Sequence, residues 1–223
     1  MTAITQFSAV NLIAEAGVDP EKWNVMPGES VIRTTAMNIE KRGMKAIHAD
    51  DGKIALELLR TIIPPGSEVM TGSSTTLNEI GFSDLLESGE RGWRSLHKVI
   101  TSENDEKKRA EVRRKSVCAD YFISSANAVA LTGELLAWDA SGSRTGAWPF
   151  AAGHLVIVAG VNKIVPTLGD AMNRVREYCF PLENARASHV YGTASIMSKG
   201  VILAHERTEG RTTVILVHEP LGY

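Results

Sequence analysis

Hydrophobic residues in this chain recur at two different spacings, and stretches of the two kinds alternate along it. Residues 50–63, DDGKIALELLRTII, place Ile54, Leu58 and Ile62 on one face at helical spacing. The short apolar run HLVIVAG at 154–160 is typical of a buried strand instead. Strands separated by helical segments favour an α/β fold with a mainly parallel sheet.

The same patterns predict the order of the elements. We expect helices over 29–42, 50–63, 75–81, 103–118 and 167–179, and strands over 44–49, 68–72, 120–124, 154–160, 200–206 and 212–219. Residues 133–147 are predicted to be β-like, with a turn at 141–143. The chain shows no repeat, low-complexity run or linker, so we expect a helical N-terminal extension (1–43) on one α/β domain (44–223).

Composition and charge exclude several classes of protein. The 223 residues are 43% hydrophobic and 22% charged, which is ordinary for a globular protein. The net charge of -2 argues against a nucleic-acid binder, and local acids balance the basic run at 107–115. The most apolar stretch, 155–161, is too short for a membrane span, and the N-terminus lacks a basic signal-peptide region. We therefore expect a cytoplasmic protein without membrane contact.

The cysteines and histidines do not predict a metal site. Two cysteines, Cys118 and Cys179, cannot supply a four-cysteine zinc or iron–sulfur site, so no iron–sulfur cluster of its own is expected. The six histidines form neither HxH nor HExxH. Dinucleotide-fingerprint, P-loop and nucleophile-elbow motifs are also missing, and a cofactor is not identified.

A small-residue loop between a predicted strand and helix is the first candidate site. Backbone N–H groups and hydroxyls at such a junction favour an anion, and ligands collect at the carboxyl ends of strands in open α/β sheets. Equally, Thr76 and Glu79 fit a simple capping box without a ligand. The ligand-binding candidates in this loop are Gly72, Ser73, Ser74 and Thr75.

Four further residues are candidates, each with a structural alternative. Asn127 follows the strand at 120–124, where it is a binding residue or a turn-forming residue. Arg144 lies between glycines and suits a carboxylate or phosphate, although it also fits a hairpin in which it pairs with Asp139. Glu134 is the candidate catalytic base or nucleophile. Lys163 follows the strand at 154–160, where it binds an anion or lies in solvent.

Several longer segments resemble one known family. The strings GSSTTLNEIGF, ADYFISSANAVALTGELLAWDASGSRTGA, LVIVAGVNKIVPTLGDAMNRV and TTVILVHEPLG are similar to the LUD (lactate-utilisation, LutC/YkgG-like) domain family from about residue 30 onward. The resemblance implies a Rossmann-like three-layer α/β domain of the NagB/RpiA/CoA-transferase group. It also implies a link to L-lactate oxidation, beside partner proteins that carry iron–sulfur clusters. Similar compact members often have cysteines where residues 181–197 have none.

Three classes of function follow from these residues. The first is an accessory or regulatory protein of lactate or related hydroxy-acid metabolism, which binds a small anionic metabolite over residues 72–76 and Arg144. The second is a CoA-transferase-like or sugar-phosphate-isomerase-like enzyme that uses Glu134, by analogy of fold. The third is an oligomeric scaffold, because Trp23, Trp93 and Trp148 suit a subunit interface as well as a core. We favour the first and expect a homo-oligomer.

Overall fold

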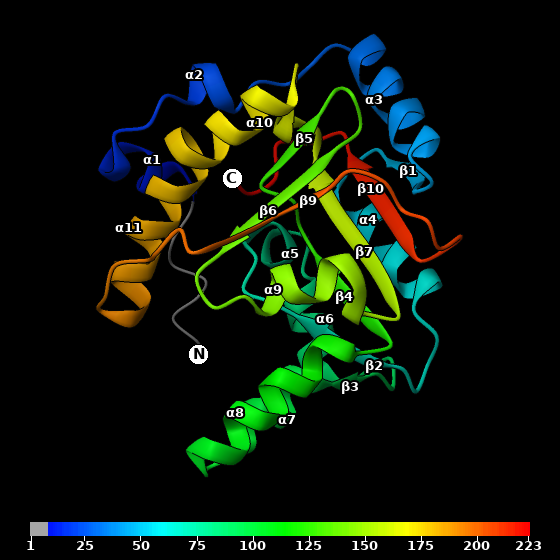
Figure 1. Cartoon of the computed structure of the whole chain (residues 1–223), viewed down its shortest axis with the longest axis vertical. Coiled ribbons are helices and arrows are strands. Elements are labelled where there is room, and N and C mark those ends of the chain that lie inside the picture. Colours follow the sequence, from blue (N-terminus) through cyan, green and yellow to red (C-terminus); the bar gives the residue numbers. More distant parts are fainter. Residues whose placement is uncertain (1–8) are drawn as a thin grey trace.

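A parallel six-stranded sheet forms the centre of the protein, with helices on both sides (Figure 1). The structure is a computed structural model that describes residues 9–223; residues 1–8 of the predicted extension lie outside the described residues. The strand order is β1-β10-β7-β4-β2-β3. The strands are β1 (Lys45–Ala49), β2 (Glu68–Thr71), β3 (Arg94–Ser95), β4 (Tyr121–Ser124), β7 (His154–Gly160) and β10 (Thr212–Val217).

The register of this sheet joins segments that are far apart in the sequence. Ile215 of β10 lies opposite Ile47 of β1 on one side and Val158 of β7 on the other. Each of these strands pairs in parallel with its neighbours, and parallel strands need crossover connections, which the helices supply. The predicted α/β fold with a mainly parallel sheet is confirmed.

A second, four-stranded sheet in the order β8-β5-β6-β9 packs beside the first. Its strands are β5 (Ala128–Ala130), β6 (Leu135–Asp139), β8 (Ile164–Val165) and β9 (Lys199–Leu203). β6 runs antiparallel to both β5 and β9. The β-like stretch predicted over 133–147 is therefore too long: its strand ends at Asp139 and the chain turns into helix.

The helices are mostly short, and the five predicted at 29–42, 50–63, 75–81, 103–118 and 167–179 begin within three residues of their predicted starts. They are α1 (Ala9–Ala16), α2 (Pro20–Trp23), α3 (Glu29–Lys41), α4 (Gly52–Ile62), α5 (Thr75–Glu79), α6 (Phe82–Ser88), α7 (Leu96–Ser102), α8 (Glu106–Lys115), α9 (Ser143–Gly146), α10 (Leu168–Arg174) and α11 (Phe180–Tyr191). Two 3₁₀ turns, η2 (Ser116–Cys118) and η4 (Val161–Lys163), and two π-helical turns, η3 (Ala147–Ala151) and η5 (Val175–Cys179), complete the secondary structure. The helix predicted over 167–179 continues through η5 and α11 to Tyr191.

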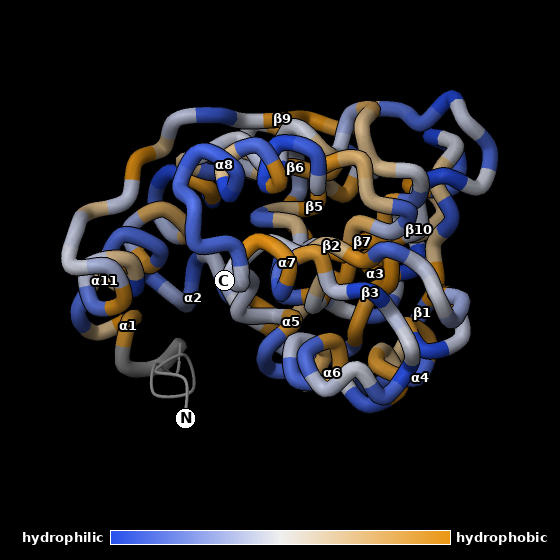
Figure 2. Tube along the Cα trace, turned by 90° about the horizontal axis from the view of Figure 1, so that it is seen from below, coloured by the Kyte–Doolittle hydropathy of each residue, from blue (hydrophilic) through white to orange (hydrophobic). Residues whose placement is uncertain are grey.

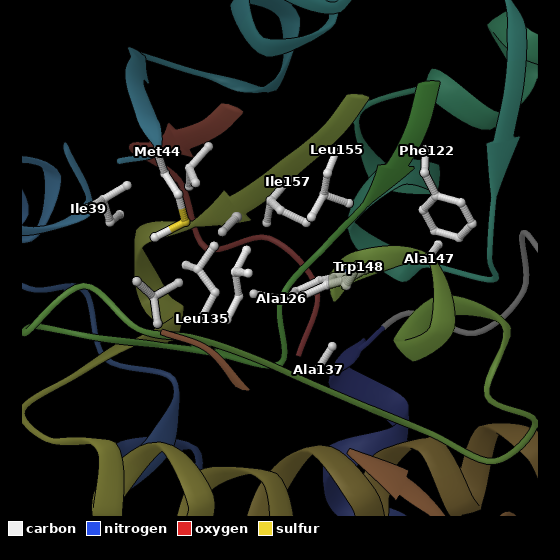
Figure 3. Close-up of a cluster of buried hydrophobic side chains, with 14 of the residues drawn as sticks. Ile39, Met44, Phe122, Ala126, Leu135, Ala137, Ala147, Trp148, Leu155 and Ile157 are labelled. Carbon is white, nitrogen blue, oxygen red and sulfur yellow. The ribbon is translucent and has the colours of Figure 1, made fainter. Parts of the chain in front are cut away.

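Three hydrophobic clusters hold the layers together. One face of the large sheet packs on α4, α5 and α6 through residues such as Leu59, Phe82 and Val158. The other face packs on the second sheet, α3 and α7 around the fully buried Trp148 (Figure 3). The outer face of the second sheet packs on α10, η5 and α11, with Tyr178 fully buried. Burial of apolar area on this scale is the main force that stabilises such a fold.

The described part of the N-terminal region packs closely on the rest. Ile32 and Ile39 of α3 belong to the same cluster as the central sheet, and Leu12 of α1 packs with α11 residues. Trp23, Trp93 and Trp148 are all buried in cores, so they do not offer a surface for subunit contact. Most of the hydrophobic segments lie in the interior of the trace, whereas α8 is mostly hydrophilic (Figure 2). Across residues 9–223, no helix combines the length and the apolar character that crossing a membrane requires.

Candidate functional site

The carboxyl ends of three neighbouring strands bring three polar segments together. β7, β4 and β2 lie side by side in the large sheet, and each is followed by a polar side chain of the site. Lys163 ends η4, directly after β7; Ser125 follows β4; Thr76 lies in α5, after the loop that leaves β2. This edge is where open α/β sheets usually bind ligands.

Lys163 is the centre of this arrangement. Its side chain is 1% exposed, so the alternative of a solvated lysine is wrong. The Nζ atom donates hydrogen bonds to Thr76 Oγ1 at 2.8 Å and to Ser125 Oγ at 2.9 Å. Ser125 Oγ in turn lies 3.2 Å from Thr76 Oγ1. The three polar atoms therefore form a closed triangle, which we call the Lys163 triangle.

The surroundings of Lys163 disfavour its charged form. Burial, assisted by the nearby positive charge of Arg174, lowers the pKa of Lys163 from 10.5 to about 7. Cys179 and Glu79 act in the opposite direction, and Arg144 adds to the lowering. Burial also raises the pKa of Glu79, even though its carboxylate accepts a hydrogen bond from the Gly222 amide at 2.6 Å.

Arg144 and Asn127 lie next to the Lys163 triangle and contact each other. The Arg144 guanidinium donates from Nη2 to Asn127 Oδ1 at 3.1 Å and to the Trp138 carbonyl, and its Nη1 lies 3.5 Å from the Ser125 carbonyl oxygen. Burial lowers the pKa of Arg144 despite the nearby Asp139. Asp139 accepts hydrogen bonds from the backbone of the turn instead, so the predicted surface pair of Asp139 with Arg144 does not form.

Arg174 lies on the far side of Asn127 and adds a further buried cation. It is fully buried and donates to the Trp23 and Asn127 carbonyls, with Nη1 also 3.0 Å from Cys179 Sγ. Its Nη2 is buried and has no hydrogen-bond partner among residues 9–223. Within the described chain, Lys163, Arg144 and Arg174 form no ion pair with a carboxylate.

The Lys163 triangle, Arg144 and Asn127 border a cavity of about 980 Å³. That volume is in the usual range for small-molecule sites, roughly 300–1,000 Å³. The lining includes six basic residues, Arg109, Arg113, Arg114, Arg144, Lys163 and Arg186, and three acidic residues, Glu106, Asp139 and Glu183. The cavity is therefore locally basic, although the whole chain carries a net charge of -2.

The structure brings together seven of the eight predicted site residues. Gly72, Ser73, Ser74, Thr75, Asn127, Arg144 and Lys163 all line the cavity. Ser74, not Thr76, caps α5, by accepting a hydrogen bond from the Leu77 amide. The alternative of a capping box formed by Thr76 and Glu79 is therefore wrong. Thr76 Oγ1 accepts a hydrogen bond from Lys163 instead, and the Glu79 carboxylate accepts one from the Gly222 amide.

Glu134 lies elsewhere. Its carboxylate pairs with Arg42 and accepts a hydrogen bond from the Thr132 hydroxyl, and it is not among the residues that line the cavity. Arg42 also donates to the carbonyls of Thr132 and Ala204. This ion pair thus joins the end of α3 to the second sheet.

Some lining residues were not candidates from sequence. Arg109, Arg113 and Arg114 of α8 were assigned to a solvated basic face, and no pattern marks which of them turns toward the cavity. Ser125 and Tyr223 also line it. The Tyr223 hydroxyl donates to Glu183 Oε2 at 2.7 Å. Ser125 lies two residues before the predicted site residue Asn127, directly after the end of the same strand.

No cluster suited to a metal is seen in the described part of the chain. Groups of three or more His, Cys, Asp or Glu side chains placed to hold an ion do not occur among residues 9–223. Cys118 is exposed and Cys179 is buried, and they are not paired.

Comparisons with known proteins agree with the fold. A crystal structure of a DUF162 family protein from Deinococcus radiodurans is similar at a TM-score of 0.50 and 12% sequence identity, over 84% of this chain and 96% of that one. No curated protein matches the sequence. The sequence model of the LUD domain matches residues 32–219. The chain therefore belongs to the LUD domain family.

Proposed function

We propose that this protein binds a small anionic metabolite in the cavity at the carboxyl ends of β2, β4 and β7. One observation carries the proposal: Arg144 and Lys163 line the cavity and Arg174 is buried behind them, and none of the three pairs with a carboxylate among the described residues. A buried charge without a partner is costly, because it gives up water and receives no compensating ion. A bound carboxylate or phosphate supplies that missing charge.

The chemical nature of the lining supports the same proposal. Arginine binds carboxylate and phosphate in a planar, forked geometry, and the hydroxyls of Ser73, Ser74 and Thr75 are further donors beside it. We infer from the family resemblance that the ligand belongs to lactate or related hydroxy-acid metabolism, and that the protein is an accessory or regulatory component. The cavity is much larger than a three-carbon acid, which favours a ligand with a larger body attached to its anionic group.

Isothermal titration calorimetry tests this function. Wild-type protein is titrated with L-lactate, pyruvate, a sugar phosphate and a CoA ester, and we expect at least one of them to bind. Arg144→Ala removes one charged donor, which is worth about 1.5–3 kcal/mol, so affinity should fall roughly 10- to 150-fold. Arg207→Ala is the matched control, because Arg207 is exposed and does not line the cavity.

Two results contradict the proposal. One is the absence of binding for every class of anion in wild-type protein. The other is an Arg144→Ala variant that binds as tightly as Arg207→Ala does. Thermal melts of both variants establish that they remain folded, since Arg144 also supports the Trp138 carbonyl and Asn127.

A further inference from the structure

The Lys163 triangle is buried and contains no acidic group. Lys163, Thr76 and Ser125 are each at most 4% exposed, and the lysine ammonium faces no carboxylate within ion-pair distance in the described chain. An apolar residue of similar size fills such a position at lower cost. A buried lysine that does not pair with an acid is therefore a candidate for chemistry.

The geometry of the triangle is that of an activated nucleophile. A serine nucleophile needs a base within about 2.6–3.2 Å, and the base needs a third group to orient it. Ser125 Oγ lies 2.9 Å from Lys163 Nζ, and Thr76 Oγ1 contacts both atoms at 3.2 Å and 2.8 Å. Pairs of serine and lysine do act as nucleophile and base on unrelated folds.

The protonation of Lys163 suits the role of base. Its pKa is lowered to about 7 by burial and by Arg174, so a large share of the amine is neutral near neutral pH. A neutral amine has a free lone pair and can accept the proton of Ser125. A lysine at its ordinary pKa of 10.5 is almost fully protonated there and cannot.

We propose that Ser125 is a nucleophile and Lys163 its general base, in the hydrolysis of an anionic carboxylic ester or amide. Lys163 Nζ takes the proton of Ser125 Oγ as the Oγ–C bond to the acyl carbon forms. The bond from that carbon to the leaving oxygen or nitrogen then breaks, and the proton of Lys163 passes to the leaving group. Water attacks the acyl-serine in the same way: Lys163 accepts a water proton and returns a proton to Ser125 Oγ as the acid leaves.

The preference for an anionic substrate rests on the proposed function of the cavity. Arg144 Nη1 lies 3.5 Å from the Ser125 backbone carbonyl oxygen, so its positive charge lies next to the residue that carries the nucleophilic hydroxyl. Such a charge stabilises both an acyl group that carries a carboxylate and the oxyanion that forms during attack. Thr76 Oγ1 contacts both Lys163 Nζ and Ser125 Oγ without taking part in the reaction, so Thr76 is a positioning residue.

Mono(4-nitrophenyl) succinate, an anionic activated ester, is the probe. We expect a rapid release of one equivalent of nitrophenolate per protein chain, and intact-mass spectrometry with peptide mapping should find the succinyl group on Ser125. Ser125→Ala should lose the burst and the adduct. Ser102→Ala is the matched control, because Ser102 lies on the exposed end of α7, and it should behave as wild type.

Substitution of the base gives a second readout. Lys163→Arg keeps a cation of similar length that does not lose its proton, so acylation should slow by about 100-fold or more. In wild type, the acylation rate should rise with pH and reach half its maximum near pH 7. The charged and titratable groups that face Lys163 are Glu79 of α5, Arg144 of α9, Arg174 of α10 and Cys179 of η5. Thr76→Val should move this midpoint and slow acylation less than Lys163→Arg does.

The outcomes separate this proposal from the function of the cavity. Succinate binding, measured by calorimetry on wild type and Ser125→Ala, reports on the anion site alone. Wild-type protein that binds succinate but gives no burst, or that is acylated at a residue other than Ser125, overturns the nucleophile and leaves the anion site standing. An acyl-Ser125 adduct without measurable succinate binding supports the nucleophile and counts against the anion site.

Discussion

Replacing Lys163 with methionine should change how the stability of the protein depends on pH. Methionine fills similar space without a charge, so the variant removes the titration of one buried amine. The folded-state pKa of Lys163 is about 7, whereas the unfolded chain has an ordinary lysine at 10.5. Between these values the unfolded state binds more protons than the folded state, so wild-type stability rises with pH across this window.

The size of the effect follows from the same two values. The interval from about pH 7 to 10.5, at about 1.4 kcal/mol for each pH unit, corresponds to about 5 kcal/mol as an upper limit. Below about pH 7 both states carry the proton, and the difference between wild type and variant should be constant. Above it, wild type should gain free energy of unfolding relative to Lys163→Met with each step in pH.

Urea unfolding followed by tryptophan fluorescence measures this difference. Both proteins are unfolded at several pH values from about 6.5 to 9.5, and the difference in free energy of unfolding is plotted against pH. Subtraction of the two curves removes the titrations that wild type and variant share. Lys53→Met is the control, because Lys53 is exposed and its curve should run parallel to wild type. Parallel curves for wild type and Lys163→Met would refute the reasoning.

Three further substitutions test a buried ion pair, a close backbone contact and a helix cap. Arg211→Met leaves the buried Glu206 carboxylate without its cation and should cost about 3–5 kcal/mol of unfolding free energy in urea titrations, whereas a loss under 1 kcal/mol contradicts a buried pair. Gly222→Ala should slow the acylation of the cavity serine and lower the melting temperature, because a Cβ there meets Thr76 Oγ1; Gly89→Ala, with a similar positive φ but open space, should lower only the melting temperature. Thr167→Ala removes the capping box of α10 and should cost about 1 kcal/mol, and an unchanged urea midpoint counts against the cap.

The central sheet can be predicted well from the sequence, because the apolar composition of its strands itself indicates that they are buried. HLVIVAG is apolar on both faces, and every residue of β7 after His154 is buried. Such a run fits only a strand that is covered on two sides. The start of the helix predicted over 167–179 is also correct, because Thr167 and Asp170, three positions apart, form a capping box there.

Two strands of the second sheet, β5 and β8, were not predictable in the same way. β5 and β8 are three and two residues long, too short to show a period, and they exist because partners from other parts of the chain lie beside them. The turn at 141–143 was predicted, yet α9 follows it, where the Asp139 carboxylate accepts hydrogen bonds from the Gly142 and Thr145 amides.

The site shows the same limit of local information. The loop at 72–75, Asn127 and Arg144 were candidates because each follows a strand or lies between glycines, and all line the cavity. The burial of Lys163 depends on Thr76, Ser125 and the backbone around Gly222, which come from three distant parts of the chain. The prediction for Glu134 rests on its residue type and on analogy of fold, whereas its ion pair with Arg42 joins residues 92 positions apart and is not visible in the local sequence. Its catalytic role stays a prediction without support from its position.

The titration of Lys163 in the presence and absence of an anion tests the central claim most directly. Protein labelled with carbon-13 at the lysine Cε atoms is titrated by NMR, and the Lys163 signal is assigned by its loss in Lys163→Arg. We predict an apparent pKa of about 7 without ligand and a clear increase when pyruvate or succinate occupies the cavity, because a nearby negative charge favours the ammonium form. A Lys163 pKa near 10.5, or one that no anion shifts, would contradict the claim that the cavity binds an anion beside this buried lysine.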